Sequence, residues 1–146
     1  MTCARNLMDN MRTGNLDMPA AEPVVEEILQ SVDRNQDALF GLCKLKQTDS
    51  YTYTHCVNVS VLSVIFARGL GATSDQLRAI GMGGLFHDLG KSLIPLRILN
   101  APRRLTESEF QVMKKHPDLG YQQICNLQGV PEEVLQITIE HHEKYN

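Results

Sequence analysis

Five histidines and one aspartate are the residues of this 146-residue sequence whose types and positions could do chemistry. His87 and Asp88 stand side by side at the end of an apolar run, and Gly90 and Lys91 follow them. Such a pair is uncommon in a packed core, because both side chains require polar partners when buried. Imidazole nitrogens and carboxylate oxygens are ligands of divalent transition metals. At a helix end that faces the interior, the pair could bind one ion, and Asp88 could bridge two.

The other four histidines also stand at or near the ends of apolar segments; they are His55, His116, His141 and His142. We expect four separate segments to bring all five histidines together around His87 and Asp88. A lone histidine in an apolar stripe is more often a hydrogen-bonded core residue, and for His55 by itself that interpretation would be preferred. The four cysteines show no CxxC spacing, which argues against a structural zinc knuckle. Cys56, next to His55, is assigned to buried packing.

Spacing at the C-terminal end suggests how two ions could be divided. Neighbours on a helix point about 100° apart, so we expect His141 and His142 to address two ions rather than one. Two ions about 3.5–4 Å apart can activate water and polarise a phosphoryl group. Lys91 could neutralise a phosphate oxygen or orient the nucleophile. The alternative for Lys91 is an ordinary cation at a helix C-terminus.

All the elements that would position these residues are predicted to be helices, and no strand alternation is convincing. Pro23 fits the first position of a helix, and Asp33-Arg34-Asn35 breaks that helix. Asp49 or Ser50 could cap a long helix that runs to Arg68. Its predicted buried face is the stripe of His55, Val59, Leu62 and Phe66.

Capping boxes predict two further helix starts, Thr73 with Gln76 and Thr106 with Glu109. Residues 92–105 are expected to form an irregular loop with exposed arginines. The cluster of Gly81, Gly83 and Gly84 predicts a close helix–helix approach. The loop arginines expected to be exposed are Arg97, Arg103 and Arg104.

The C-terminal third is predicted to carry a bend and two helices. Pro117 disfavours helical geometry at His116, so a bend is expected there before a helix over 118–127. Pro131 starts the last helix. Its two parallel apolar stripes both look buried, and they end in His141 and His142.

Composition limits the function classes. Hydrophobic residues make up 42% and charged residues 21%, as in one globular domain. Aromatics at 5%, no tryptophan and a net charge of -3 argue against DNA or RNA binding. Neither a signal peptide nor a membrane-spanning run is apparent, so a cytoplasmic protein is expected.

Residues 1–20 are predicted to be a linker or signalling helix, and residues 21–146 are predicted to form the domain. The N-terminal stripe could support a homodimer, with local packing as an equal alternative.

An ordered series of motifs resembles the HD-GYP family, a branch of the HD metal-dependent phosphohydrolases, over roughly residues 20 to 146. The motifs are His87-Asp88-Leu89-Gly90-Lys91, Ile94-Pro95, Ile98-Leu99-Asn100, Leu105-Thr106, His116 with Gly120, and His141-His142-Glu143. Upstream, the resemblance continues through Arg34-Asn35, Asp37-Ala38-Leu39, Lys46 and Tyr51-Thr52-Tyr53-Thr54-His55.

The resemblance implies an all-α, HD-domain-like bundle of about six to eight helices. It also implies a bacterial phosphodiesterase that hydrolyses the small molecule cyclic di-GMP to pGpG or GMP. Two divalent ions would be bound, with Fe or Mn favoured and Zn or Ni as alternatives. The implied metal ligands are His55, His87, Asp88, His116, His141 and His142. The implied catalytic residues are Asp88, which would bridge the ions, and Lys91, which would contact the nucleophile or the scissile phosphate.

Two departures from the family pattern refine these expectations. Tyr51 stands where family members with a third metal have a glutamate, which favours two ions. The family pattern continues into a Gly-Tyr-Pro motif, whereas this sequence stops at Asn146, so a fragment is expected. Two other readings stay open: a non-catalytic nucleotide-sensing or protein-interaction module, and another HD-type nucleotide phosphohydrolase.

Overall fold

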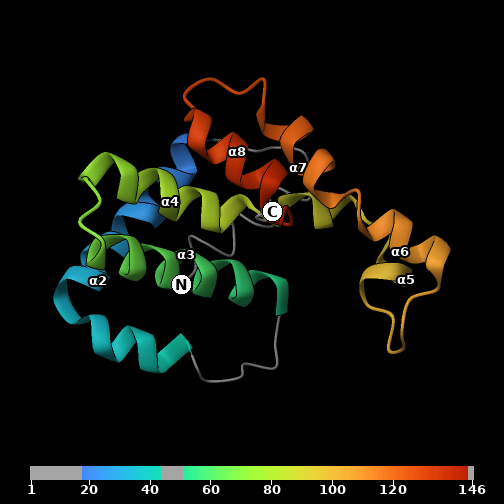
Figure 1. The fold of residues 1–146 in the computed structure, drawn as a ribbon, viewed down its shortest axis with the longest axis horizontal. Coiled ribbons are helices and arrows are strands. Elements are labelled where there is room, and N and C mark those ends of the chain that lie inside the picture. The colour runs from blue at the N-terminus through green and yellow to red at the C-terminus, as the bar shows by residue number, and fades with distance from the viewer. Residues whose placement is uncertain (1–17, 44–50, 145–146) are drawn as a thin grey trace.

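The computed structural model describes residues 18–43 and 51–144, and within these ranges the regular structure is helical (Figure 1). The elements are α2 (Met18–Cys43), α3 (Tyr51–Gly69), α4 (Ser74–Phe86), the 3₁₀ turn η1 (Leu89–Leu93), α5 (Leu96–Leu99), α6 (Glu107–Met113), α7 (His116–Ile124) and α8 (Glu132–Glu140). The all-α, HD-domain-like bundle predicted from the sequence is confirmed. No helix in the described part of the chain is long and apolar enough to span a membrane.

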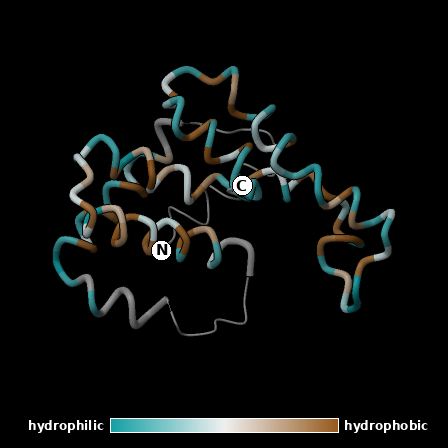
Figure 2. Tube along the Cα trace, viewed as in Figure 1, coloured by the Kyte–Doolittle hydropathy of each residue, from teal (hydrophilic) through white to brown (hydrophobic). Residues whose placement is uncertain are grey.

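The core lies where α2, α3 and α4 pack together, and α8 covers α4 from the other side. α7 packs on η1 and α8, whereas α5 and α6 project from the body (Figure 1). Figure 2 shows apolar stretches along α3 and α4. The buried cluster includes four apolar residues of α2: Val25, Ile28, Leu29 and Val32.

Two predictions about α2 have different outcomes. The helix begins at Met18, so the predicted start at Pro23 is wrong and the proline lies inside the helix. It removes one backbone hydrogen bond there, a loss that burial of the following apolar stripe offsets. The predicted break is confirmed, because Asn35 has the non-helical angles φ -162° and ψ 81° and divides α2 into two segments. The predicted N-terminal helix and dimer contact, and the Asp49 or Ser50 cap, lie outside the described residues.

The buried face of α3 differs from the one predicted. Phe66 is 70% exposed and Leu62 36% exposed, so the stripe expected to continue from His55 is not buried. The buried residues are instead Cys56, Ser60, Val61, Val64 and Ala67. The reason is that α3 is apolar on several sides, so its sequence pattern does not select one face.

Glycines on α4 confirm the predicted close helix–helix approach. A Cβ atom built at Gly84 would lie 2.6 Å from Ser60 Cα, and one at Gly83 would lie 2.5 Å from Ile137 Cδ1. Any larger side chain would therefore push α4 away from α3 or α8. The Ser60 hydroxyl donates to the Gly81 carbonyl at 2.7 Å, which adds a polar link between α3 and α4.

Helix starts in the second half are mostly as predicted. Both capping boxes form, at Thr73 and at Thr106. The loop expected over 92–105 is partly wrong, because η1 extends to Leu93 and α5 adds a helical turn. Its arginines are exposed as predicted, and Arg103 pairs with Glu109 at 2.8 Å. The turn before α7 lies at residues 114–115 rather than at His116 as predicted, and α7 begins at His116 rather than at residue 118. α8 begins just after Pro131.

Candidate metal centre

Asp88 is the middle of the candidate site, and its side chain is only 2% exposed. It lies in the short step between α4 and η1. Its oxygen Oδ2 is 2.6 Å from Lys91 Nζ, 3.3 Å from His87 Nε2 and 3.5 Å from His55 Nε2. Its oxygen Oδ1 is 3.3 Å from His116 Nε2 and 3.7 Å from His141 Nε2. One carboxylate therefore faces histidines from two sides.

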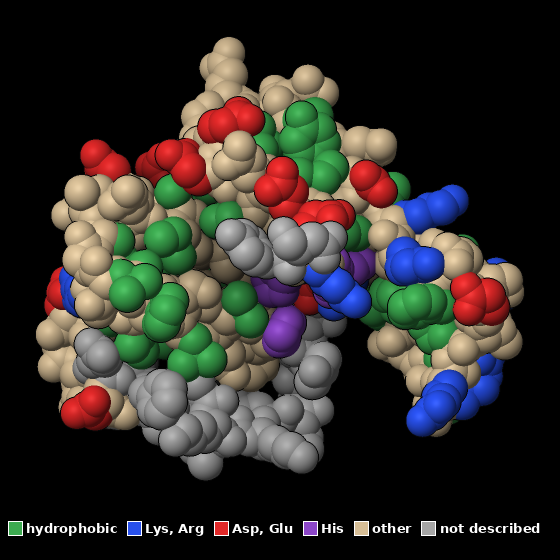
Figure 3. Space-filling view, in the orientation of Figure 1, with side chains coloured by type: hydrophobic (Ala, Val, Ile, Leu, Met, Phe, Trp, Pro, Cys, Tyr) green, Lys and Arg blue, Asp and Glu red, His purple; other side chains and the backbone are tan. Residues whose placement is uncertain are grey.

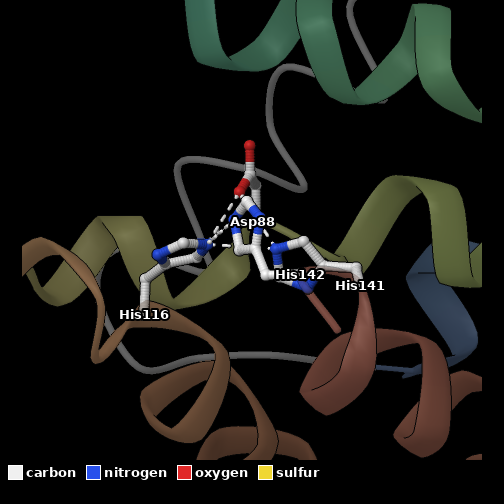
Figure 4. A group of neighbouring side chains, drawn as sticks. All are labelled: Asp88, His116, His141 and His142. Atoms are coloured by element: carbon white, nitrogen blue, oxygen red, sulfur yellow. Dashed lines mark hydrogen bonds and ion pairs between the residues drawn. The ribbon is translucent and has the colours of Figure 1, made fainter. Parts of the chain in front are cut away.

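Two donor groups share this aspartate. The four-donor group consists of Asp88, His116, His141 and His142, and the three-donor group consists of His55, His87 and Asp88. Within each group the nitrogen and oxygen atoms lie within 4.8 Å of one another. Figure 4 shows the four-donor group, whose rings converge on the carboxylate. All five histidines are thus brought together around Asp88, as the sequence predicted.

Three of these histidines are oriented by the same local contact. The Nδ1 atom of His87 lies 2.8 Å from the Gly84 carbonyl oxygen. The equivalent pairs are His116 with Met113 at 2.8 Å and His141 with Thr138 at 2.9 Å. Each carbonyl stands three residues earlier, in the last turn of a helix, where carbonyl oxygens lack an intrahelical partner. A carbonyl oxygen can only accept, so each Nδ1 carries the hydrogen and each Nε2 presents a lone pair.

As a result, Nε2 atoms of neighbouring rings lie close together with no hydrogen atom between them. His116 Nε2 and His141 Nε2 are 3.0 Å apart, and both have their ring hydrogen on Nδ1. Two facing lone pairs repel unless a cation lies between or beside them. In addition, the buried Asp88 Oδ1 makes no hydrogen bond within the described part of the chain, although the nitrogen atoms are near. Both observations fit a bound cation.

Donor spacing and donor type agree with that fit. Metal–nitrogen bonds of about 2.0–2.1 Å place neighbouring ligands about 3–3.4 Å apart in tetrahedral or octahedral geometry. The Nε2 separations of 3.0 Å and 3.2 Å around His116 lie in this range. Nitrogen and carboxylate donors together suit Fe, Mn, Zn or Ni. The described donor sets therefore could hold divalent ions.

Protonation states also suit metal binding. Burial lowers the pKa of His141 to about 4, and burial likewise lowers the pKa of His55 and of His142. These rings are neutral at pH 7, the form that binds metals. Burial alone would raise the pKa of Asp88, but the Lys91 ammonium, 2.6 Å from Oδ2, helps to hold it well below its usual range. Asp88 is therefore a carboxylate.

One sequence prediction about these ligands is wrong. His141 and His142 were expected to address different ions, yet both belong to the four-donor group, with ring centroids 4.2 Å apart. His141 is the C-cap of α8 and His142 lies beyond it. The regular helical step therefore no longer separates the two side chains.

Three other residues that the sequence singles out near this site are Cys56, Lys91 and Tyr51. Burial, with a contribution from the charge of Asp88, raises the pKa of the Cys56 thiol to about 12, so the predicted packing role is confirmed. Lys91 lies against Asp88, and its side chain is 25% exposed. The side chain of Tyr51 lies outside the described residues. The sequence reasoning missed the carbonyls that orient the rings, although a histidine at a helix C-terminus is the available signal.

Comparison with known proteins identifies the family. The model of the HD domain matches residues 52–146, which contain every donor described above. The chain belongs to the HD domain family. This confirms the sequence prediction of a metal-dependent phosphohydrolase fold.

Curated relatives of this HD domain support its resemblance to the HD-GYP branch. A cyclic di-GMP phosphodiesterase of Pseudomonas aeruginosa is 38% identical over 129 residues, covering 88% of this chain and 31% of the relative. A cyclic di-GMP phosphodiesterase response regulator of Xanthomonas campestris is 33% identical over 116 residues, covering 78% and 31%. A cyclic di-GMP phosphodiesterase of Thermotoga maritima is 32% identical over 120 residues, covering 76% and 32%. The chain thus spans about a third of the length of these relatives.

Proposed function

We propose that this HD domain is the hydrolytic part of a metal-dependent phosphodiesterase that converts cyclic di-GMP to pGpG or GMP. The observation that carries the proposal is the position of Asp88, whose two carboxylate oxygens face two different groups of histidines. One carboxylate shared between two histidine groups can hold two ions close together, as two-ion phosphoryl-transfer sites do. The names of the three relatives support the choice of substrate.

Each donor group would hold one divalent ion, iron or manganese in the first instance. The four-donor group would hold the first and the three-donor group the second, with Asp88 shared between them. When bound, such ions lower the pKa of water and polarise a phosphoryl oxygen. The described residues fix the positions of the donors, because helix-end carbonyls hold three of the rings.

Lys91 is assigned to the substrate phosphate. Its ammonium group lies 2.6 Å from Asp88 Oδ2, and a quarter of the side chain is exposed, at 25%. A cation placed there can hold a phosphate oxygen and stabilise the charge that develops on it during hydrolysis. Histidine side chains reach the surface at the middle of the face drawn in Figure 3, beside a cationic side chain. A diester can therefore approach the centre from solvent on this face.

The direct test is product formation by the protein loaded anaerobically with Mn²⁺ or Fe²⁺. We expect chromatography to show linear pGpG or GMP from cyclic di-GMP. Asp88→Asn should abolish metal retention and lower the rate about 10²–10³-fold or more, because both groups lose the shared carboxylate. Asp118→Asn, an exposed carboxylate at the start of α7, is the matched control and should change neither. A metal-loaded wild type that forms no product would contradict the proposal.

Lys91→Met separates the substrate role from the metal role. The substitution leaves every histidine and the Asp88 carboxylate in place, so we expect metal content to stay within about 2-fold. The rate should fall about 10²-fold, as for loss of one charge-stabilising donor. An unchanged rate would remove Lys91 from the catalytic assignment while leaving the metal centre intact.

A further inference from the structure

Gly120 of α7 packs closely against two other small residues near the donors, Gly90 of η1 and Thr138 of α8. A Cβ atom built at Gly120 would lie 3.1 Å from Gly90 N and 3.1 Å from Thr138 Cγ2. One built at Gly90 would lie 2.6 Å from Gly120 N and would overlap the His116 carbonyl oxygen. At Gly120, α7 is therefore in close contact with both η1 and α8, with no room for another side chain.

Each of these residues is a short distance along the chain from a donor. Gly90 follows Asp88 by two positions, and Gly120 lies one helical turn after His116. Thr138 is fully buried, and its carbonyl oxygen accepts the Nδ1 hydrogen of His141 at 2.9 Å. Its hydroxyl donates to the Val134 carbonyl at 2.8 Å, which fixes its rotamer. A displacement at this contact would therefore move three donors relative to one another.

Metal binding tolerates little displacement of that kind. Ligand distances must lie within about 0.2 Å of their preferred values. A methyl group at Gly120 would force η1 or α8 to move by a few tenths of an ångström, because 3.1 Å is shorter than an ordinary carbon contact of about 3.5–4.0 Å. The required movement is thus as large as the tolerance.

We propose that Gly90, Gly120 and Thr138 are positioning residues that set the donor spacing of the four-donor group. This inference rests on the proposed metal centre and extends it to residues that bind no ion themselves. Their contact acts as a spacer: it determines how far Asp88, His116 and His141 stand from one another.

The test compares two glycine-to-alanine variants in which the new methyl group would lie at the same distance from its nearest neighbour. Gly81 is the matched control, because a Cβ built there would also lie 3.1 Å from its nearest neighbour, Val25 Cγ1, but this contact lies away from the donors. Alanine raises helix propensity similarly at both positions. We expect Gly120→Ala to weaken Co²⁺ and Mn²⁺ binding about 10-fold or more and to shift the Co²⁺ absorption spectrum. Gly81→Ala should change the affinity less than about 2-fold, whatever its effect on unfolding without metal.

A compensating substitution provides the sharper readout. Thr138→Ser removes Cγ2, the atom that meets the new methyl group, and keeps the hydroxyl and the carbonyl. In the double variant Gly120→Ala/Thr138→Ser we expect about a third or more of the lost affinity, on a logarithmic scale, to return. Recovery should be partial, because the Gly90 N contact remains. A role in stability alone would not restore the Co²⁺ spectrum.

The outcomes separate this inference from the proposed function. A wild type that binds no Co²⁺ or Mn²⁺ overturns the metal centre itself. A wild type that binds while Gly120→Ala binds equally well overturns the positioning role and leaves the centre standing. If Gly120→Ala does not fold, Thr138→Ala takes its place, because it removes the Cγ2 atom that packs against Gly120 and adds none. We expect this loosening of the spacer to weaken Co²⁺ binding as well. Unchanged affinity in folded Thr138→Ala would likewise refute the positioning role.

Discussion

The two donor groups that share Asp88 are built in different ways. In the four-donor group, the carbonyl at the end of α6 holds His116 and a carbonyl in the last turn of α8 holds His141, and their side chains are 4% and 12% exposed. In the three-donor group, His87 is held in the same way, but His55 lies within α3 and its side chain is 39% exposed. A ring held by a helix end is preorganised, so the comparison predicts that the four-donor group binds its ion more tightly.

His116→Gln should have the largest effect, because it removes the histidine whose Nε2 lies nearest to both His141 and Asp88 Oδ1. We expect the tight ion to be lost, with an affinity decrease of about 100-fold or more. Chelator competition followed by elemental analysis measures this change. If the tight ion remained at full occupancy, the four-donor group would not be the stronger one.

His55→Gln should have a smaller and more selective effect. It removes only the half-exposed donor of the three-donor group. We expect the stoichiometry to fall from two ions per chain to one, while the affinity for the first ion changes less than about 3-fold. Loss of both ions together would show that the two groups do not bind independently.

Acid should weaken the metal-free fold through the same rings. Burial holds the pKa of His141 at about 4 and lowers the pKa of His55 and of His142 below the ordinary value. Between about pH 6.5 and pH 4 the unfolded chain therefore binds more protons than the folded one, so the free energy of unfolding falls as the pH decreases. Urea unfolding of the chelator-treated protein at pH 7.5 and pH 5 measures this. His141→Gln should reduce the difference between the two pH values, and an unreduced difference would contradict the assignment.

Cys56→Ala should have the smallest effect on the centre. The thiol is next to His55 in sequence, but burial raises its pKa to about 12 and keeps it from becoming a thiolate ligand. We expect unchanged metal content and a loss of about 1 kcal/mol in the free energy of unfolding. A drop in ion stoichiometry would instead add Cys56 to the three-donor group.

The sequence predicts the donors and most helix limits because those signals are local. Capping boxes at Thr73 and Thr106 specify helix starts, and the break at Asn35 follows from a run of polar residues. The glycines of α4 indicate a close approach because alanine would cost less in an isolated helix. Each of these inferences depends on a few neighbouring residues.

Tertiary choices could not be predicted in the same way. α3 carries apolar residues on several sides, so only packing against α2 and α4 selects Cys56, Ser60 and Val64 as the buried face. The grouping of His141 with His142 depends on backbone geometry just past the end of α8, where the helical rule no longer applies. Contact among Gly90, Gly120 and Thr138 joins positions far apart in sequence, and no local pattern encodes it.

The helix-end carbonyls have a consequence for the order of binding. α4, α6 and α8 all direct carboxyl ends toward the centre, and each such end carries a partial negative charge of about half an electron. Asp88 adds a full negative charge, which Lys91 offsets. Without bound metal, the centre therefore attracts cations and repels anionic phosphodiesters. Under the proposed function, we therefore expect the anionic substrate to bind only after metal uptake, so its apparent affinity would itself report the supply of metal ions.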